Sequence, residues 1–352
     1  MATAIFRPCG DFKTSYRTDT TIFPTRLSRL ACLAGVALLA AAPLALSGYY
    51  LNMLIQIGYY GIAALGLNIL VGFTGQISLG HSAFFGFGAF ASAWLHNAFG
   101  VPVALSIPLA GVLTTAVGMV FGLPAARLKG LYLAIATLAS QFIIQDFFAR
   151  ADWFSGGAAG ANAGTFALFS FEFSTDQRYF YVVLAYVVIM YIAAANLMRT
   201  RDGRALIAVR DHYLSAEIMG INLTKYRILS FGISSFYAGV GGALFAHYLG
   251  FVGVEGFDIL LSIQFLGMII IGGLGSIMGS LMGTAFLVLL PEAMELLTKS
   301  LKHIPSLTAG LPYLKQMSIG LAIILFLVFE PDGLAHRWRQ VKAYWKLYPF
   351  SY

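Results

Sequence analysis

Glycines and hydrogen-bonding side chains interrupt an otherwise apolar stretch, VGFTGQISLGHSAFFGFGAF, at residues 71–90. Gln76, Ser78 and His81 supply amide, hydroxyl and imidazole groups, and Gly75 gives the backbone beside them unusual freedom. Polar groups among apolar residues are unfavourable unless they are paired or meet water. These groups could therefore contact a polar solute or form hydrogen bonds within a core, and for His81 both roles remain open.

A second stretch of the same kind, GGLGSIMGSLMGTAF, covers residues 272–286, about 200 residues later. Both stretches run Gly, two residues, Gly, and then reach a serine. Matched glycine-interrupted segments predict two related halves with a transport pathway at their interface. Tight helix packing also uses such glycines, and it is the better interpretation for each glycine taken singly. The pathway residues predicted in the second stretch are Gly272, Gly273, Gly275 and Ser276.

The composition is that of a membrane protein. Of the 352 residues, 59% are hydrophobic and 11% are charged, whereas soluble domains carry about 25% charged residues. Such an apolar excess, with a mean hydropathy of +0.79, must face lipid. The apolar runs are continuous, which predicts an all-α, polytopic transmembrane helical bundle rather than a barrel. Basic cytoplasmic loops account for the net charge of +7, so we expect no nucleic-acid partner.

Basic residues decide how many times the chain crosses the membrane. A break at 272–276 would split the stretch 259–296 into two spans, give ten in all and return the C-terminal tail to the cytoplasm. Five basic residues in the N-terminal tail, two near residue 128, six in 199–227 and four in the C-terminal tail then lie inside, 17 of 22. The other predicted spans are 30–47, 49–72, 78–98, 101–123, 130–148, 179–197, 227–250 and 313–330.

This topology divides the chain into three parts. Residues 1–29 form a basic cytoplasmic tail, which is long for a signal peptide, so the first span is expected to be retained. Residues 30–335 form the transmembrane domain, and residues 336–352 form a second cytoplasmic tail.

The longest inner loop, residues 199–226, has an amphipathic middle bracketed by Gly203 and Gly220. A short helix held off the membrane there would offer a ridge to a partner groove. From these residues alone, an ordinary positively charged loop is the simpler interpretation.

Several motifs are missing from the sequence. There is no GxxxxGK[ST] phosphate loop, so the energy for transport must come from a separate ATPase or an ion gradient. Charged relay groups for an ion-coupled carrier are scarce within the first spans. No GxSxG or HExxH motif indicates an enzyme, and the histidines and cysteines lack metal-ligand spacing. We therefore expect a protein that is not an enzyme and has no cofactor and no metal.

Three segments carry a family resemblance: GLNILVGFTGQISLGHSAFFGFGAF (66–90), RLKGLYLAIATLA (127–139) and IGGLGSIMGSLMGTAF (271–286). Together they closely resemble LivM-like permeases of branched-chain amino-acid ABC importers, over roughly residues 50–335. The resemblance implies a second related permease subunit, cytoplasmic ABC ATPase subunits and a periplasmic solute-binding protein as partners. It also implies a place in the lipid of a bacterial cytoplasmic (inner) membrane, and the distribution of basic residues predicts that both termini are cytoplasmic.

The resemblance also gives residues 199–226 the role of a loop that couples the permease to its ATPase. Arg210 and Asp211 would make ionic contacts with the ATPase, and small residues would permit its close approach. Branched-chain amino acids are the first expected solutes; other amino acids, urea or short amides remain open, as does an ATP-independent carrier or channel. The residues matching the family's coupling pattern are Gly203, Arg204, Ala205, Arg210, Asp211, Ala216, Gly220 and Ile221.

Overall fold

A computed structural model of the chain describes residues 26–128, 130–168, 171–173, 175–300 and 310–347. Most of the predicted N-terminal tail and residues 348–352 of the predicted C-terminal tail lie outside these ranges. The long helices are α2 (Arg26–Ala45), α3 (Gly48–Val71), α4 (His81–Phe99), α5 (Val103–Ala125), α6 (Leu131–Arg150), α8 (Asp176–Leu197), α11 (Leu223–Leu249), α12 (Ile259–Gly272), α13 (Ile277–Ser300), α15 (Leu311–Phe329) and α16 (Gly333–Leu347). The shorter elements are α7 (Asp152–Ser155), α9 (Arg201–Asp211), α10 (Tyr213–Ile218), the 3-10 turns η1 (Gly157–Ala159) and η2 (Val254–Gly256), and the strands β1 (Ala161–Asn162), β2 (Ala167–Leu168), β3 (Phe171–Glu172) and β4 (Phe251–Val252).

The all-α, polytopic architecture is confirmed. Eight described segments are long and apolar enough to span a membrane, in α3, α5, α6, α8, α11, α12, α13 and α15. The other two expected spans correspond to α2, whose apolar part is Arg29–Ala45, and to α4. Histidine, serine and asparagine lower the hydropathy of α4, which begins at His81 instead of the predicted residue 78. A total of ten spans and a division into two related halves stay predictions.

Helices α3 and α11 form the centre of the bundle, and α15 lies at its outside. The apolar windows of α3 and α11 are 78% and 72% buried, whereas that of α15 is 6% buried. Small residues let the central helices approach closely, as expected from their sequence. A Cβ atom at Gly88 of α4, for example, would lie 2.3 Å from the Cα of Gly239 of α11.

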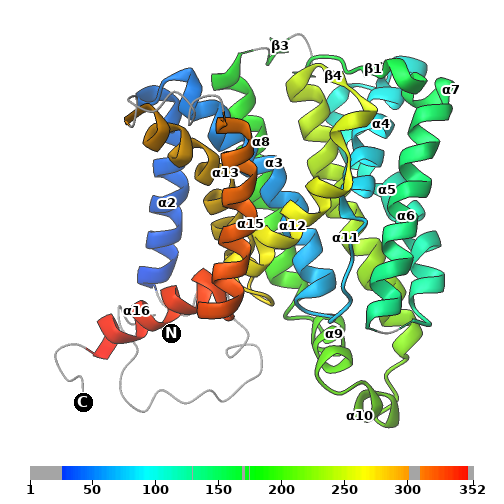
Figure 1. Cartoon of the computed structure of the whole chain (residues 1–352), viewed down its shortest axis with the longest axis vertical. Coiled ribbons are helices and arrows are strands. Elements are labelled where there is room, and N and C mark those ends of the chain that lie inside the picture. Colours follow the sequence, from blue (N-terminus) through cyan, green and yellow to red (C-terminus); the bar gives the residue numbers. More distant parts are fainter. Residues whose placement is uncertain (1–25, 129, 169–170, 174, 301–309, 348–352) are drawn as a thin grey trace.

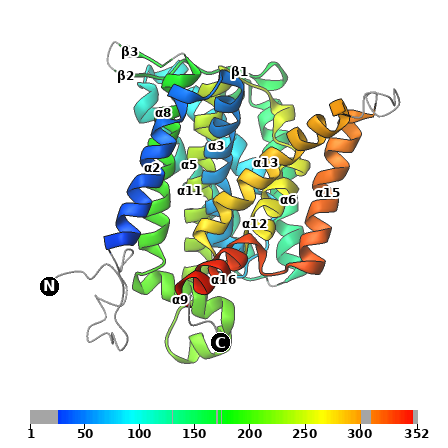
Figure 2. The same cartoon turned by 90° about the vertical axis from the view of Figure 1, so that its left-hand side faces the viewer.

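The bundle has two distinct ends. The strands lie at one, where β1 pairs with β4 and β2 with β3, both antiparallel, and we call it the strand end. The other carries α9, α10 and α16, and we call it the basic end (Figure 1). Helix α2 begins and α16 ends at this basic end, as Figure 2 also shows. An even number of crossings fits that arrangement.

Both glycine-broken stretches interrupt helices. The chain leaves α3 at Gly72, and α4 begins only at His81. The expected break of 259–296 is confirmed, because α12 ends at Gly272 and α13 begins at Ile277.

Candidate functional site

The first turns of α4 and α12 meet inside the bundle. The His81 ring nitrogen Nε2 lies 2.9 Å from the carbonyl oxygen of Ala63. Ala63 precedes the end of α3 by eight residues, about 12 Å along a helix. The backbone N–H of Ser82 donates to the hydroxyl of Ser262 at 2.9 Å, which places the first turn of α12 at the same depth.

Gln141 of α6 joins these two turns into a closed polar cluster. Its Oε1 accepts from the Ala83 N–H at 2.9 Å and lies 3.0 Å from the Ser82 hydroxyl. Its Nε2 donates to the carbonyl oxygen of Phe257 at 2.7 Å. Gln141, Ser82 and Ser262 are all fully buried, so the chain itself satisfies this cluster. We call Ser82, Gln141 and Ser262 the inner cluster.

His81 lies against the inner cluster and is enclosed by the chain. Its side chain is 1% exposed, and its ring meets the Phe265 ring edge-on with centroids 5.4 Å apart. With the bond to Ala63, these contacts favour the core role over the solute-contacting role.

The two glycine-broken stretches meet each other at the basic end. Asn68 of α3, which is fully buried, donates through Nδ2 to the carbonyl of Ser276 at 2.8 Å. Its Oδ1 accepts from the N–H of Gly275 at 2.9 Å. A Cβ atom at Gly72 would lie 2.4 Å from the Gly275 nitrogen, so only glycine permits this approach. Sequence reasoning missed Asn68, although a single asparagine within the apolar run GLNILVG is the signal that could have found it.

Arg210 of α9 lies over the same meeting point. Its Nη1 donates to the carbonyl oxygen of Gly72 at 2.6 Å, and its Nε donates to Asp211 at 2.8 Å. A Cβ atom at Gly75 would lie 3.0 Å from the Arg210 Cγ, and one at Gly275 3.1 Å from Nη1. Gly75 and Gly275 have φ of 71° and 73°, which glycine adopts without strain. Arg210 thus connects α9 to both breaks, and we call Asn68, Gly72, Gly75, Arg210 and Gly275 the basic-end junction.

The other predicted pathway residues are placed differently. Ser78 is 1% exposed and Gln76 is 4% exposed, with Gln76 Nε2 donating to the Ser230 hydroxyl at 2.6 Å. Gly272 and Gly273 are buried where α12 ends, and Gly273 has φ of 112°. Together with Gly75, Gly275 and Ser276 these residues gather towards the basic end, whereas His81 lies deeper in the bundle.

Helices α9 and α10 protrude from the basic end (Figure 1). The small residues of the predicted coupling pattern face inward: Gly203, Ala205 and Ala216 are buried. A Cβ atom at Gly203 would lie 2.3 Å from the Leu197 carbonyl oxygen, so the close approach that this glycine permits is internal to the chain. Of the remaining pattern residues, Arg204, Asp211 and Gly220 are exposed and Ile221 is partly buried.

Three large apolar side chains at the tip of this protrusion were not among the predicted site residues. Leu214, Ile218 and Met219 are 60%, 85% and 82% exposed. They lie beyond the ends of α8 and α11, the helices that flank the loop, so lipid is not expected to cover them. They are exposed because α10 packs inward through Ala216. The sequence does not reveal which face of α10 packs inward, so it could not single out these side chains.

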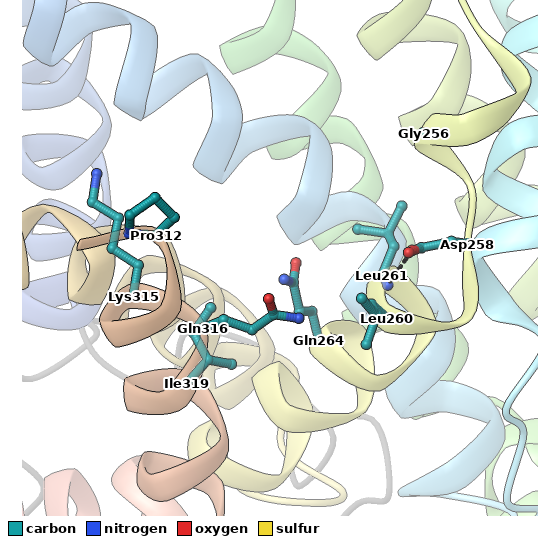
Figure 3. Close-up of a pocket in the computed structure, with 9 residues that line it drawn as sticks. All are labelled: Gly256, Asp258, Leu260, Leu261, Gln264, Pro312, Lys315, Gln316 and Ile319. Carbon is teal, nitrogen blue, oxygen red and sulfur yellow. Dashed lines mark hydrogen bonds between the residues drawn. The ribbon is translucent and has the colours of Figure 1, made fainter. Parts of the chain in front are cut away.

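A cleft of about 380 Å³ opens between α12 and α15 on the outside of the bundle. Gln264 of α12 and Gln316 of α15 extend toward each other across it (Figure 3). Neither side chain forms a hydrogen bond with any residue that the structure describes. Asp258 at one side accepts from the Leu261 N–H at 3.0 Å. The cleft is lined by Gly256, Asp258, Leu260, Leu261, Gln264, Pro312, Lys315, Gln316 and Ile319.

Comparison with known proteins places the chain in a family. Residues 49–327 match the model of the family described as the branched-chain amino acid transport system / permease component. The high-affinity branched-chain amino acid transport system permease protein LivM of Salmonella typhimurium is 29% identical over 78% of this chain and 67% of its own length, and LivM of Escherichia coli is 28% identical over the same shares. The fructose import permease protein FruG of Bifidobacterium longum is 25% identical over 95% of this chain and 98% of its own. No solved structure matches the chain. The chain therefore belongs to the family of branched-chain amino acid transport system permease components.

Proposed function

We propose that the chain is one of two related permease subunits of a bacterial ABC importer that carries branched-chain amino acids across the cytoplasmic membrane. Its basic end faces the cytoplasm, where separate ATPase subunits supply the energy. A periplasmic binding protein delivers the solute to the strand end. The family assignment supports the permease role, and the LivM relatives support the solute.

The observation that carries this proposal is the contact of Arg210 with both helix breaks. An ATPase that moved α9 would pull on the carbonyl of Gly72 through a 2.6 Å hydrogen bond. The same side chain borders Gly75 and Gly275, so both breaks would feel the displacement. Glycine turns are suited to this because they change backbone angles at low steric cost.

The apolar tip of α10 supplies the docking surface for the motor. Leu214, Ile218 and Met219 expose apolar surface to water, which is unfavourable in the free chain and favourable once a partner groove covers it. Asp211, which is exposed beside the tip, remains the proposed ionic contact. Arg210 instead acts within the chain, as the link from α9 to the breaks.

The cleft between α12 and α15 is proposed to form one side of the path that the solute takes. Unpaired amides facing lipid would be costly, so Gln264 and Gln316 require water or another subunit beside them. A second permease packed over this face would enclose the cleft and keep it wet. Neutral amides can bind both the carboxylate and the ammonium of a zwitterionic solute.

Loss of ATPase binding tests the docking surface. We expect Ile218→Asp to place a charge in the apolar groove of the ATPase and to abolish its copurification with the permease pair. Thr224→Asp adds the same charge at an exposed position of α11 and should leave copurification intact. Retention of the ATPase by Ile218→Asp would contradict the assignment of this surface.

Uptake by the reconstituted complex tests the solute. Labelled leucine should accumulate, with competition by isoleucine and valine and none by urea or fructose. Competition by urea alone would move the chain to the short-amide importers, and competition by fructose alone would move it to the sugar importers.

A further inference from the structure

Helix α16 begins where the chain leaves the apolar zone of the bundle. The last turn of α15 is apolar and faces outward, with Val328 and Phe329 67% and 73% exposed. The chain then turns at Gly333, whose φ is 70° and whose Cβ position lies 2.5 Å from the nitrogen of Gly273. Helix α16 therefore starts four residues after Phe329 and runs across the basic end instead of continuing α15 (Figures 1 and 2).

The faces of α16 differ sharply in chemistry. Trp338, Val341 and Tyr344 follow one another at three-residue spacing and form an apolar stripe that is 49%, 52% and 65% exposed. Arg339 and Lys342 form the neighbouring stripe, and neither makes an ion pair or hydrogen bond with any residue in the described ranges.

Two polar side chains of α16 that neighbour the apolar stripe are already paired within the chain. Gln340 lies 2.9 Å from the ring nitrogen of His336, and the Arg337 Nε donates to both carboxylate oxygens of Glu330 at 2.8 Å. Among the described residues, the apolar stripe stays exposed and the cationic stripe stays unpaired.

We propose that α16 is an interfacial helix that binds anionic phospholipid at the boundary of the membrane. The apolar stripe inserts among the upper acyl segments, where tryptophan and tyrosine are favoured at the interface. Arg339 and Lys342, beside that stripe, bind the lipid phosphates while their stems stay in the apolar zone. Two features favour lipid as the partner: the charge complementarity, and the continuity of α16 with the outward apolar surface of α15.

Lipid bound here would bear on transport through Gly273. Residues Gly333 and Ala335 pack against Gly273, which lies in the second helix break beside the basic-end junction. Anchoring α16 to lipid would hold this side of the break in place. Lipid binding by α16 itself does not depend on which solute the protein carries.

Spin-label accessibility in the full complex tests the proposal. In a chain with Cys9→Ser and Cys32→Ser, a nitroxide is attached at Val341→Cys or, as the matched exposed position on the opposite side of the helix, at Ala343→Cys. The complexes are placed in nanodiscs containing phosphatidylglycerol or only phosphatidylcholine. With phosphatidylglycerol, we expect the label at 341 to be relaxed by oxygen more than by a water-soluble nickel chelate, and the label at 343 to show the reverse.

Charge removal supplies the second readout. In phosphatidylcholine alone, the preference of the label at 341 for oxygen should be weaker, because the cationic stripe finds no anionic lipid. The double variant Arg339→Gln, Lys342→Gln should lower the preference in phosphatidylglycerol to the same weaker level. Preferential relaxation by the nickel chelate at 341 in phosphatidylglycerol would overturn the proposal, because it would place the stripe in water. Protection from both reagents would overturn it as well, because a protein partner would then cover the stripe. Neither outcome depends on transport activity, so failure here is distinct from failure of the proposed function.

Discussion

Gln141 and Gln264 are both glutamines on membrane-spanning helices, yet their surroundings are opposite. Gln141 is fully buried, and both ends of its amide are engaged by Ala83 and Phe257 at 2.9 and 2.7 Å. Gln264 lines an open cleft with Gln316, and neither forms a hydrogen bond with a described residue. The difference separates two uses of polarity in a membrane: a closed cluster fixes the fold, whereas open amides leave their bonding capacity to a solute or a second subunit.

Removing the amide of Gln141 should have the largest effect. Gln141→Leu leaves the Ala83 N–H and the Phe257 carbonyl unpaired in a dry interior, which we expect to cost at least about 3 kcal/mol. The free energy of unfolding of the complex in mixed micelles measures the loss. Ile143→Leu, on the outward face of the same helix, serves as control. An unchanged unfolding free energy for Gln141→Leu would contradict the claim that the closed cluster stabilises the fold.

The opposite result is expected in the cleft. Gln264→Leu and Gln316→Leu leave no partner unpaired in the described structure, so unfolding should be unchanged. Solute uptake should fall about tenfold or more, as expected when one solute hydrogen bond is lost. ATPase copurification, measured on the same preparations, should persist. Normal uptake by both variants would show that the cleft does not contact the solute.

Ser262 allows a finer test of the inner cluster. Its hydroxyl accepts from the Ser82 N–H and lies 2.9 Å from the Ser82 hydroxyl. Ser262→Ala should cost about 1–2 kcal/mol of unfolding free energy, less than the change at Gln141 because fewer groups lose their partner. The exposed Ser215→Ala gives the reference value. A larger loss for Ser262→Ala than for Gln141→Leu would reverse the assigned order of importance.

The smallest effect on stability is expected for the solvent-exposed ion pair between Arg337 and Glu330. The hydrogen bond from Arg337 lowers the pKa of Glu330 from its ordinary value of 4.5. Because the folded-state pKa is depressed, the pair supports the α15–α16 turn above pH 4.5 and loses this contribution as the pH falls through the folded-state pKa. Exposed pairs are weak, so only a slight loosening of α16 is expected. Amide exchange of α16 should detect it on acidification and should lose this pH dependence in Glu330→Gln; equal pH dependence in both proteins would contradict the assignment.

The sequence predicted what depends on local pattern. Long apolar runs identified the membrane helices, and glycine clusters located the two breaks, which the structure places at 72–80 and 273–276. The sequence also predicted the helix α4, but its hydropathy is too low for it to be among the eight candidate spans, so the count of ten spans stays a prediction. These features arise from neighbouring residues and can be recognised without the fold.

Contacts between distant residues could not be predicted in the same way. Arg210 bonds to Gly72 across 138 positions, and Asn68 bonds to Gly275 across 207. The sequence shows only that Arg210 is a charged residue in a loop between two spans, which suggested a contact with the ATPase. Only the packing of α9 against the bundle reveals that Arg210 reaches the two helix breaks. Likewise, Gln264 and Gln316 become a pair only when α12 and α15 lie side by side.

Uphill uptake by the reconstituted complex tests the central claim most directly. Vesicles with permease pair, ATPase and binding protein should concentrate labelled leucine when ATP is present, and the chain without ATPase should not. Arg210→Met should keep the ATPase bound yet uncouple hydrolysis from uptake, while Arg201→Met, an exposed arginine of the same helix, should transport normally. Concentrative uptake by the chain without ATPase, or undiminished coupling in Arg210→Met, would contradict the account.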